Sequence, residues 1–295
     1  MLEFKVLTLE DKELFDTYIK KNKFLTSEYS FMSLFIWRKV FDTQYCIYKN
    51  ALIIKKKSKE FGSFFMQPIG YKSEDLNKII DTLAEYKKIN HMEYLFRNVE
   101  APFLEKLNIN FKNRFKIGIE ENNFDYIYES ENLINLSGRK FSSKRNHITR
   151  FVNNYNYRVE DINTHNVQEC IKLAQEWCRA NNSDGLISYE TESIITMLNN
   201  FHKLKFYGMV VYVEDKISAF TIGEIANEEM AIIHVEKAFS EVQGLYPFIN
   251  KTFAEKYFKD IKFINREDDM GLEGLRKAKQ SYHPYKLEYK QTVNL

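Results

Sequence analysis

Apolar residues recur along this chain with two different periods, which predicts helices interleaved with short strands. Over 167–178 and over 194–201 the apolar positions follow the spacing of one face of a helix. Three strand-like runs follow at 206–213, 217–225 and 230–237, with polar turns between them. The second half of the chain is therefore predicted to hold two helices followed by a three-stranded meander.

The same periodicity extends to both ends of the chain. After the meander, Tyr246, Ile249, Phe253 and Tyr257 fall on one face of a further helix. The remaining predicted elements are strands at 2–7, 64–66, 261–265 and 285–289, a hairpin over 45–55, and helices at 10–21, 27–41, 73–86 and 272–282. Because short strands and helices alternate throughout, the sequence predicts a mixed α/β (α+β) fold.

The composition bounds the number of domains. With 295 residues, of which 44% are hydrophobic, the chain has apolar material for about two compact domains. We place the boundary near residue 130, giving domains over 1–130 and 131–295 with a linking helix across 140–152. Apolar runs are far shorter than the roughly 18 residues that cross a bilayer. We therefore expect a cytoplasmic protein with reduced cysteines, no signal peptide and no membrane-spanning segment.

The formal net charge of +2 gives no general attraction to nucleic acid or membrane, so phosphate binding needs a local cluster. Between Glu131 and Glu160 six basic residues occur without an acidic one, namely Arg139, Lys140, Lys144, Arg145, Arg150 and Arg158. In a helix over 141–152, Lys144 would share the inward face with Phe151. The cluster is either a solvated helix face or a contact for a phosphate-bearing ligand.

Two titratable side chains lie on the third strand of the meander. Strand alternation places His234 and Glu236 on one face together with Met230 and Ile232. Such groups cost free energy to bury unless they are paired, and an attacking amine or hydroxyl needs a positioned base. His234 or Glu236 is therefore a candidate base, and the alternative is a structural hydrogen-bonding role. Glu224 on the neighbouring strand has a weaker claim.

A polar segment, 265–269, follows the strand predicted before the last long helix. Ligand-binding groups of α/β sheets gather at such strand ends. Asp268 or Asp269 could recognise a cationic aminoacyl group or act as a base, and Arg266 could anchor an anion. The alternative is that the two carboxylates complement the positive N-terminus of the following helix. No His or Cys lies near them at ligand spacing, so we expect no metal site.

The element order over 166–290 resembles the GNAT-type N-acyltransferase fold, and the run VVYVEDKISAF at 210–220 resembles its second and third core strands. This resemblance implies a slot for the acyl group beside the third meander strand, and a following loop that binds the pyrophosphate of coenzyme A. Of the Gly-rich signature of that loop, this sequence keeps Gln243 and Gly244. Tyr282 lies near the position of the tyrosine with which many GNAT enzymes reprotonate the leaving thiolate, although its spacing also fits core packing.

Two further segments resemble tandem-GNAT aminoacyl transferases. They are LSGRKFSSKRNHI at 136–148, similar to the linking helix, and NREDDMGLEGLRKAKQSY at 265–282. Together they are similar to the family named for the C-terminal domain of phosphatidylglycerol lysyltransferase, which is related to the Fem-type peptidoglycan aminoacyl transferases. The resemblance covers essentially the whole chain and implies two tandem GNAT-like domains.

These features predict an acyl- or aminoacyltransferase whose donor is an aminoacyl-tRNA or an acyl-coenzyme A and whose acceptor is an amine or hydroxyl of a lipid headgroup, peptide or small molecule. The predicted donor-binding residues are Lys144, Arg145, Asn146, Gln243, Gly244 and Arg266. The catalytic candidates are His234, Glu236, Asp268, Asp269 and Tyr282. Two alternatives stay open: an acetyl-coenzyme A-dependent N-acetyltransferase, and a catalytically silent GNAT-fold binding protein. The predicted partners are a lipid or small-molecule acceptor and, as donor, tRNA, and the predicted cytoplasmic location allows peripheral contact with the membrane.

Overall fold

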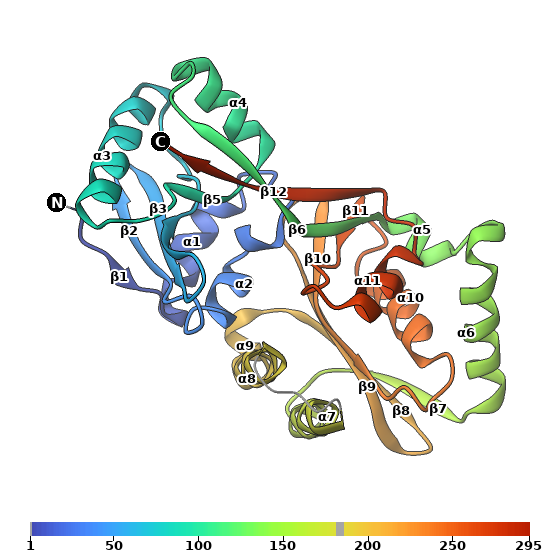
Figure 1. Cartoon of the computed structure of the whole chain (residues 1–295). Coiled ribbons are helices and arrows are strands. Elements are labelled where there is room, and N and C mark those ends of the chain that lie inside the picture. Colours follow the sequence, from blue (N-terminus) through green and yellow to red (C-terminus); the bar gives the residue numbers. More distant parts are fainter. Residues whose placement is uncertain (1, 181–185) are drawn as a thin grey trace. The chain divides into compact units, whose positions relative to one another are not determined.

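The computed structural model describes residues 2–180 and 186–295, and the chain divides into two compact units (Figure 1). The first unit comprises Met1–Asp125 and Glu288–Leu295, and the second comprises Tyr126–Leu287. Strands β6 (Lys116–Glu129) and β12 (Lys286–Asn294) each contribute residues to both units. Strands and helices alternate in each unit, so the predicted mixed α/β fold is confirmed.

The first unit is built on a sheet with the strand order β1-β2-β3-β4-β5-β12. Its own strands are β1 (Lys5–Val6), β2 (Gln44–Tyr48), β3 (Ala51–Ser58), β4 (Gly62–Phe65) and β5 (Phe96–Val99). Its α-helices are α1 (Lys12–Ile19), α2 (Phe31–Ile36), α3 (Leu76–Ile89) and α4 (Ala101–Asn110). The predicted hairpin is β2 with β3, and α3 lies at the place of the helix predicted from 73–86.

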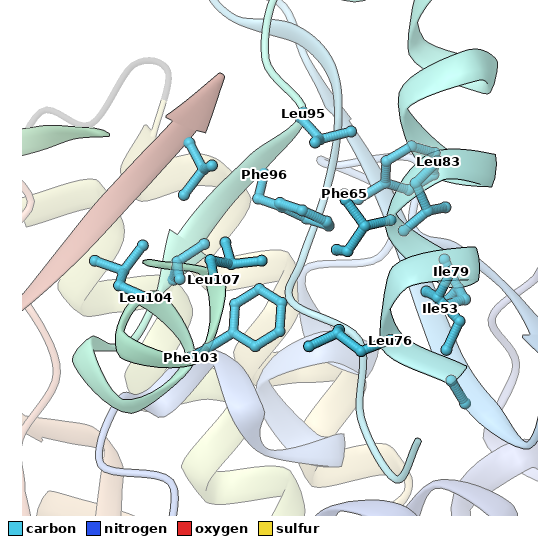
Figure 2. Packing of buried hydrophobic residues seen from close by; sticks show 14 of the residues in the cluster. Ile53, Phe65, Leu76, Ile79, Leu83, Leu95, Phe96, Phe103, Leu104 and Leu107 are labelled. Atoms are coloured by element: carbon cyan, nitrogen blue, oxygen red, sulfur yellow. The ribbon is translucent and has the colours of Figure 1, made fainter. Parts of the chain in front are cut away.

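The core of the first unit lies between its sheet and helices α3 and α4 (Figure 2). Phe65 of β4 and Phe96 of β5 are paired across neighbouring strands, and both are fully buried. Against them pack Leu83 of α3 and Phe103 of α4. Helix α3 forms here because its apolar residues recur every three or four positions and cover one face of the sheet.

The second unit is built on a sheet with the strand order β6-β11-β10-β9-β8-β7. Its strands besides β6 are β7 (Tyr157–Asp161), β8 (Tyr207–Val213), β9 (Lys216–Ile225), β10 (Met230–Ala238) and β11 (Phe263–Asn265). Its helices are α5 (Ser130–Asn135), α6 (Ser142–Asn154), α7 (Val167–Ala180), α8 (Leu186–Asn199), α9 (Phe201–Leu204), α10 (Leu245–Tyr257) and α11 (Glu273–Gln280). The predicted meander is confirmed as β8, β9 and β10.

Helices cover both faces of this second sheet. Helices α6, α10 and α11 lie on one side and α7 and α8 lie on the other (Figure 1). Helix α10 forms because Leu245, Ile249 and Phe253 give it a buried face, and Gly244 precedes it with a φ of 83°. Strand β7 was not predicted, because it is the last strand of the sheet and, as is usual at an edge, its sequence is largely polar.

Candidate functional site

The second sheet opens between β10 and β11. These two strands pair in parallel only through Met230–Ile232 and Phe263–Asn265. Beyond Asn265 the chain follows β6 instead, since the amide of Arg266 donates to the Tyr126 carbonyl at 3.0 Å and the amide of Tyr126 donates to the Glu267 carbonyl at 3.1 Å. Strand β10 therefore diverges from β11 at the position where the GNAT resemblance implies a slot. We call this opening the splay.

A β-bulge in β10 separates the two candidate bases. The register of β10 against β9 shifts at the position of His234, so β10 carries one extra residue there. Glu236 lies opposite Thr221 of β9, whereas the His234 ring contacts Glu224, three positions further along β9. Residues three apart on a strand project from opposite faces. The prediction that His234 and Glu236 share a face was wrong, because the bulge interrupts the alternation on which it depended.

On the α10 side, Glu236 holds two groups in place. Its Oε1 accepts a hydrogen bond from Nη2 of Arg266 at 3.0 Å, and its Oε2 accepts one from Nδ2 of Asn250 at 2.8 Å. Arg266 extends from the end of β11, so this ion pair spans the splay. Burial disfavours the charged guanidinium, but the neighbouring Glu236 carboxylate outweighs it and raises the pKa of Arg266.

On the opposite face, His234 lies between two carboxylates. Its Nδ1 is 2.7 Å from Oε1 of Glu267 and its Nε2 is 3.0 Å from Oε1 of Glu224. Burial alone would lower the pKa of His234, but hydrogen bonds with the two carboxylates raise it to about 9. The ring is therefore a protonated imidazolium at neutral pH, with both nitrogens engaged. Like Arg266, Glu267 reaches across the splay, so a second ion pair spans it.

Lys144 lies on the inward side of α6, close to Arg266. The neighbours of Lys144 on the predicted inward face, Phe141 and Phe151, are fully buried, as the helical spacing predicted. The Lys144 ammonium donates to Oγ of Ser281 at 2.7 Å and lies 4.1 Å from the centre of the Tyr282 ring. Burial, and after it the charge of Arg266, lowers the pKa of Lys144. Lys144 is a half-buried cation that no carboxylate in the described residues pairs with directly.

Tyr282 packs in the interior beside the same cations. It is 5% exposed, its ring meets the Tyr128 ring edge-on, and the Arg266 guanidinium lies 4.9 Å from its centre. Burial raises the pKa of its hydroxyl. This surrounding fits the packing role that the sequence also allowed, and a catalytic role for Tyr282 stays a prediction.

The segment between β11 and α11 is fixed by the ammonium of Lys279. This buried side chain donates to the backbone carbonyls of Arg266, Glu267 and Asp268, which satisfies the three donors of an ammonium group. The segment needs such support because Glu267 has a φ of 57°, a conformation that costs a non-glycine residue energy. Lys279 therefore determines where the Arg266 and Glu267 side chains begin.

The two predicted carboxylates of this segment have local partners. Asp269 is buried and accepts hydrogen bonds from the Tyr126 hydroxyl and from Nε of Arg276, both at 2.7 Å. Burial opposes the charge of Asp269, but the hydrogen bonds from Arg276 and Tyr126 hold its pKa below the ordinary value. Asp268 accepts the amide of Met270 at 3.0 Å. Both thus stabilise the turn before α11, and their substrate-binding role stays a prediction.

The remaining predicted donor-binding residues lie around α6 and the start of α10. Arg145 donates to the carbonyls of Leu136 and Gly138 at the end of α5, so its guanidinium closes that helix. Asn146 and Gln243 are exposed. A Cβ on Gly244 would come 2.1 Å from the carbonyl oxygen of His147, so the backbone of α6 lies directly against the N-terminus of α10.

Sequence reasoning did not find Asn250, Glu267 or Lys279. Asn250 had a usable signal, because it falls on the apolar face of α10 one turn after Tyr246 and is fully buried. Glu267 and Lys279 had none, because their partners depend on how the chain turns after β11.

Neither a metal site nor a bilayer-spanning helix stands out. Within residues 2–180 and 186–295, no three His, Cys, Asp or Glu side chains gather as a metal site would require. Over the same ranges no helix is both long enough and apolar enough to span a bilayer.

The family model described as "Phosphatidylglycerol lysyltransferase, C-terminal" matches residues 21–294. Among curated proteins, an uncharacterized protein of Mycoplasmoides gallisepticum is 23% identical over 172 residues, which cover 56% of this chain and 54% of that protein. The match thus spans about half the length of this curated relative.

Three solved structures are similar over nearly the whole chain. A conserved protein of unknown function from Bacteroides thetaiotaomicron is 34% identical, with a TM-score of 0.93 and complete coverage of both chains. The C-terminal domain of a putative lysylphosphatidylglycerol synthetase from Agrobacterium fabrum is 14% identical, with a TM-score of 0.67 over 97% of this chain and 92% of that one. FemX is 12% identical, with a TM-score of 0.60 over 100% and 97%.

The similarities to the synthetase domain and to FemX are at low identity and show a shared fold. The match of the family model is of a different kind, because it covers almost every residue, including both segments on which the resemblance was based. The family predicted from the sequence is thereby confirmed. This chain belongs to the family of the phosphatidylglycerol lysyltransferase C-terminal domain.

Proposed function

We propose that this protein is an aminoacyltransferase that moves an aminoacyl group from an ester donor, such as aminoacyl-tRNA, to an amine or hydroxyl acceptor at the splay. The name of its family and that of the synthetase domain with the same fold both refer to transfer of an amino acid to a lipid headgroup.

The observation that supports this proposal is the hydrogen bonding of the Arg266 guanidinium. Its Nη2 donates to Glu236, while its buried Nη1 has no hydrogen-bond partner among the residues that the structure describes. A buried donor without a partner costs free energy, so its position calls for a ligand or a bound water. Because Glu236 compensates the charge of Arg266, the pair suits a polar carbonyl group better than a phosphate. A fixed guanidinium donor stabilises the oxyanion that forms when an ester carbonyl is attacked.

The other residues of the site have separate roles in this proposal. The acceptor nitrogen or oxygen attacks the carbonyl carbon, the bond from that carbon to the donor's ribose oxygen breaks, and the acceptor's proton ends on that oxygen. Lys144, with which no carboxylate of the described residues pairs, holds a phosphate of the donor. His234 and Glu236 are already engaged by fixed partners, so we assign them to positioning Glu267 and Arg266 rather than to proton removal.

One feature supports an ester donor over coenzyme A. The GNAT resemblance places the coenzyme A pyrophosphate at the N-terminus of α10, and there the His147 carbonyl of α6 packs against Gly244. The start of α10 therefore does not fit the pyrophosphate of coenzyme A.

Transfer assays with purified full-length chain test the proposal. The donors are alanyl-tRNA, lysyl-tRNA and acetyl-coenzyme A, and the acceptors are phosphatidylglycerol vesicles, a pool of amino acids and a peptide ending in lysine. We expect turnover with a charged tRNA and none with acetyl-coenzyme A. Turnover with acetyl-coenzyme A alone would establish the N-acetyltransferase alternative, and no turnover with tight tRNA binding would establish a silent binding protein.

Variants then assign the roles. Lys144→Ala should raise the donor KM about tenfold, as expected for loss of one charge-assisted hydrogen bond, whereas Arg266→Gln should lower kcat about 100-fold. Lys251→Ala is the matched control, because Lys251 is a lysine of the same unit that pairs with Glu255 on the outside of α10. If Lys144→Ala and Arg266→Gln behave like the control, the site is elsewhere.

A further inference from the structure

Glu236 leaves one polar atom of each of its two partners unused. Arg266 keeps a buried Nη1 donor and Asn250 keeps a buried Oδ1 acceptor, and neither atom has a hydrogen-bond partner within residues 2–180 and 186–295. Asn250 is 0% exposed, so its amide is entirely removed from bulk water. Its orientation is set by the bond from Nδ2 to Glu236, which fixes Oδ1 as the free end. One donor and one acceptor, anchored on the same carboxylate, therefore lie unpaired beside the splay.

We infer that Arg266 and Asn250 form a two-point subsite for the aminoacyl group, in which Asn250 recognises the free α-amino group. This inference rests on the proposed function and extends it to the group that distinguishes an aminoacyl donor from a simple acyl donor. Nη1 of Arg266 donates to the ester carbonyl oxygen. Oδ1 of Asn250 accepts from the α-ammonium, whose nitrogen is separated from the carbonyl carbon by a single carbon atom.

The electrostatics of the subsite favour this orientation. The Glu236 carboxylate lies directly behind the Asn250 amide, so a cation bound at Oδ1 is attracted and a carboxylate or phosphate there is repelled. Lys144, with which no carboxylate of the described residues pairs, supplies the positive charge for the donor phosphate. A donor that carries an ammonium at one end and a phosphate at the other thus meets the complementary charge at each end.

The subsite lies beneath partly exposed side chains. Nη1 of Arg266 and Oδ1 of Asn250 are buried, whereas the side chains of Arg266 and Glu236 each keep 11% of their surface exposed, and β10 and β11 no longer pair beyond Ile232 and Asn265. Recognition by a buried hydrogen-bonding group also gives strong discrimination, because a ligand that lacks the matching group leaves the amide oxygen unpaired. Asn250 is therefore a specificity-determining residue and Arg266 is the residue that contacts the reacting carbonyl.

The first test measures binding, so that its outcome does not depend on turnover. Full-length protein is titrated calorimetrically with 3′-alanylamido-3′-deoxyadenosine, a stable amide analogue of the donor end, and with the propionyl analogue, which lacks only the α-amino group. We expect the alanyl compound to bind at least tenfold more tightly. Equal affinity of the two compounds would overturn the inference, even if the protein transfers aminoacyl groups.

Variants of Asn250 assign the preference to this residue. Asn250→Leu keeps the volume and removes the acceptor, so the preference for the alanyl compound should disappear while the affinity for the propionyl compound changes little. Asn250→Ser serves as the second variant if the leucine variant does not fold, because its hydroxyl is shorter and should reduce the preference. An undiminished preference in a folded variant would show that the amide of Asn250 binds only water.

The transfer assay separates this inference from the proposed function. Wild-type protein is compared on alanyl-tRNA and N-acetylalanyl-tRNA, and we expect a kcat/KM at least tenfold higher with the free α-amino group. Equal use of the two donors would leave the transferase proposal intact and refute the subsite. Absence of transfer from either donor, together with a retained preference in the calorimetry, would refute the transferase proposal and keep the subsite.

Discussion

The ion pairs of His234 make a quantitative prediction about the pH dependence of stability. The ring is fully buried between Glu224 and Glu267, and its pKa is raised from the ordinary 6.5 to about 9. One pKa unit corresponds to about 1.4 kcal/mol, so the raised pKa of His234 corresponds to about 3 kcal/mol of stabilisation of the folded state by the bound proton. The folded protein binds this proton more tightly than the unfolded chain does. The stabilisation is therefore complete below pH 6.5 and is lost as the pH rises through about 9.

The perturbation that tests this value is His234→Gln, which removes the titrating ring. Urea unfolding of wild type and variant is followed from pH 6 to pH 9.5, and the free energy of unfolding is extrapolated to water at each pH. We expect the variant to be less stable by about 3 kcal/mol at pH 6, and the difference to shrink steadily above pH 6.5. His165→Gln, at an exposed position, serves as the control and should give a curve parallel to that of wild type. A His234→Gln curve that also runs parallel to wild type would refute the protonated ring between two carboxylates.

Three further predictions concern the supports of the fold and the site. In thermal unfolding, Gly244→Ala should destabilise the protein by at least about 2 kcal/mol more than Gly138→Ala. Both glycines have a φ near 84°, but only a Cβ at Gly244 would meet the backbone of α6. Equal effects of the two substitutions would contradict the packing of α6 on α10. Lys290→Met should lower the free energy of unfolding in urea by about 3–5 kcal/mol, because the buried Lys290 ammonium lies 2.6 Å from Glu28 and 2.8 Å from Asp125. A decrease below about 1 kcal/mol would contradict these two ion pairs. Lys279→Met should lower kcat about tenfold or more, because the Lys279 ammonium positions Arg266 by binding backbone carbonyls. Addition of methylammonium should restore part of the lost kcat. A rise in donor KM at unchanged kcat would instead indicate that Lys279 binds the donor directly.

The sequence by itself determined the local elements of the second unit. The helical spacing of apolar residues predicted α10, and the strand-like apolar runs predicted the meander. Both patterns arise because each element buries one of its faces against a neighbouring element. The same helical spacing placed Lys144 on the inward side of α6, since it lies three positions after Phe141 and seven before Phe151, and both of these residues are buried. The motifs at 136–148 and 265–282 also identified the family. These features need only neighbours that are close in sequence.

The tertiary structure alone decided how the candidate residues meet. Alternation placed His234 and Glu236 on one face, but a bulge that depends on pairing with β9 moved them to opposite faces. Glu236 accepts hydrogen bonds from Asn250, 14 positions away, and from Arg266, 30 positions away, and no periodicity encodes these separations. Lys279 reaches three carbonyls because the segment after β11 turns back over it. Long-range contacts of this kind depend on strand order and register, which a single sequence does not reveal.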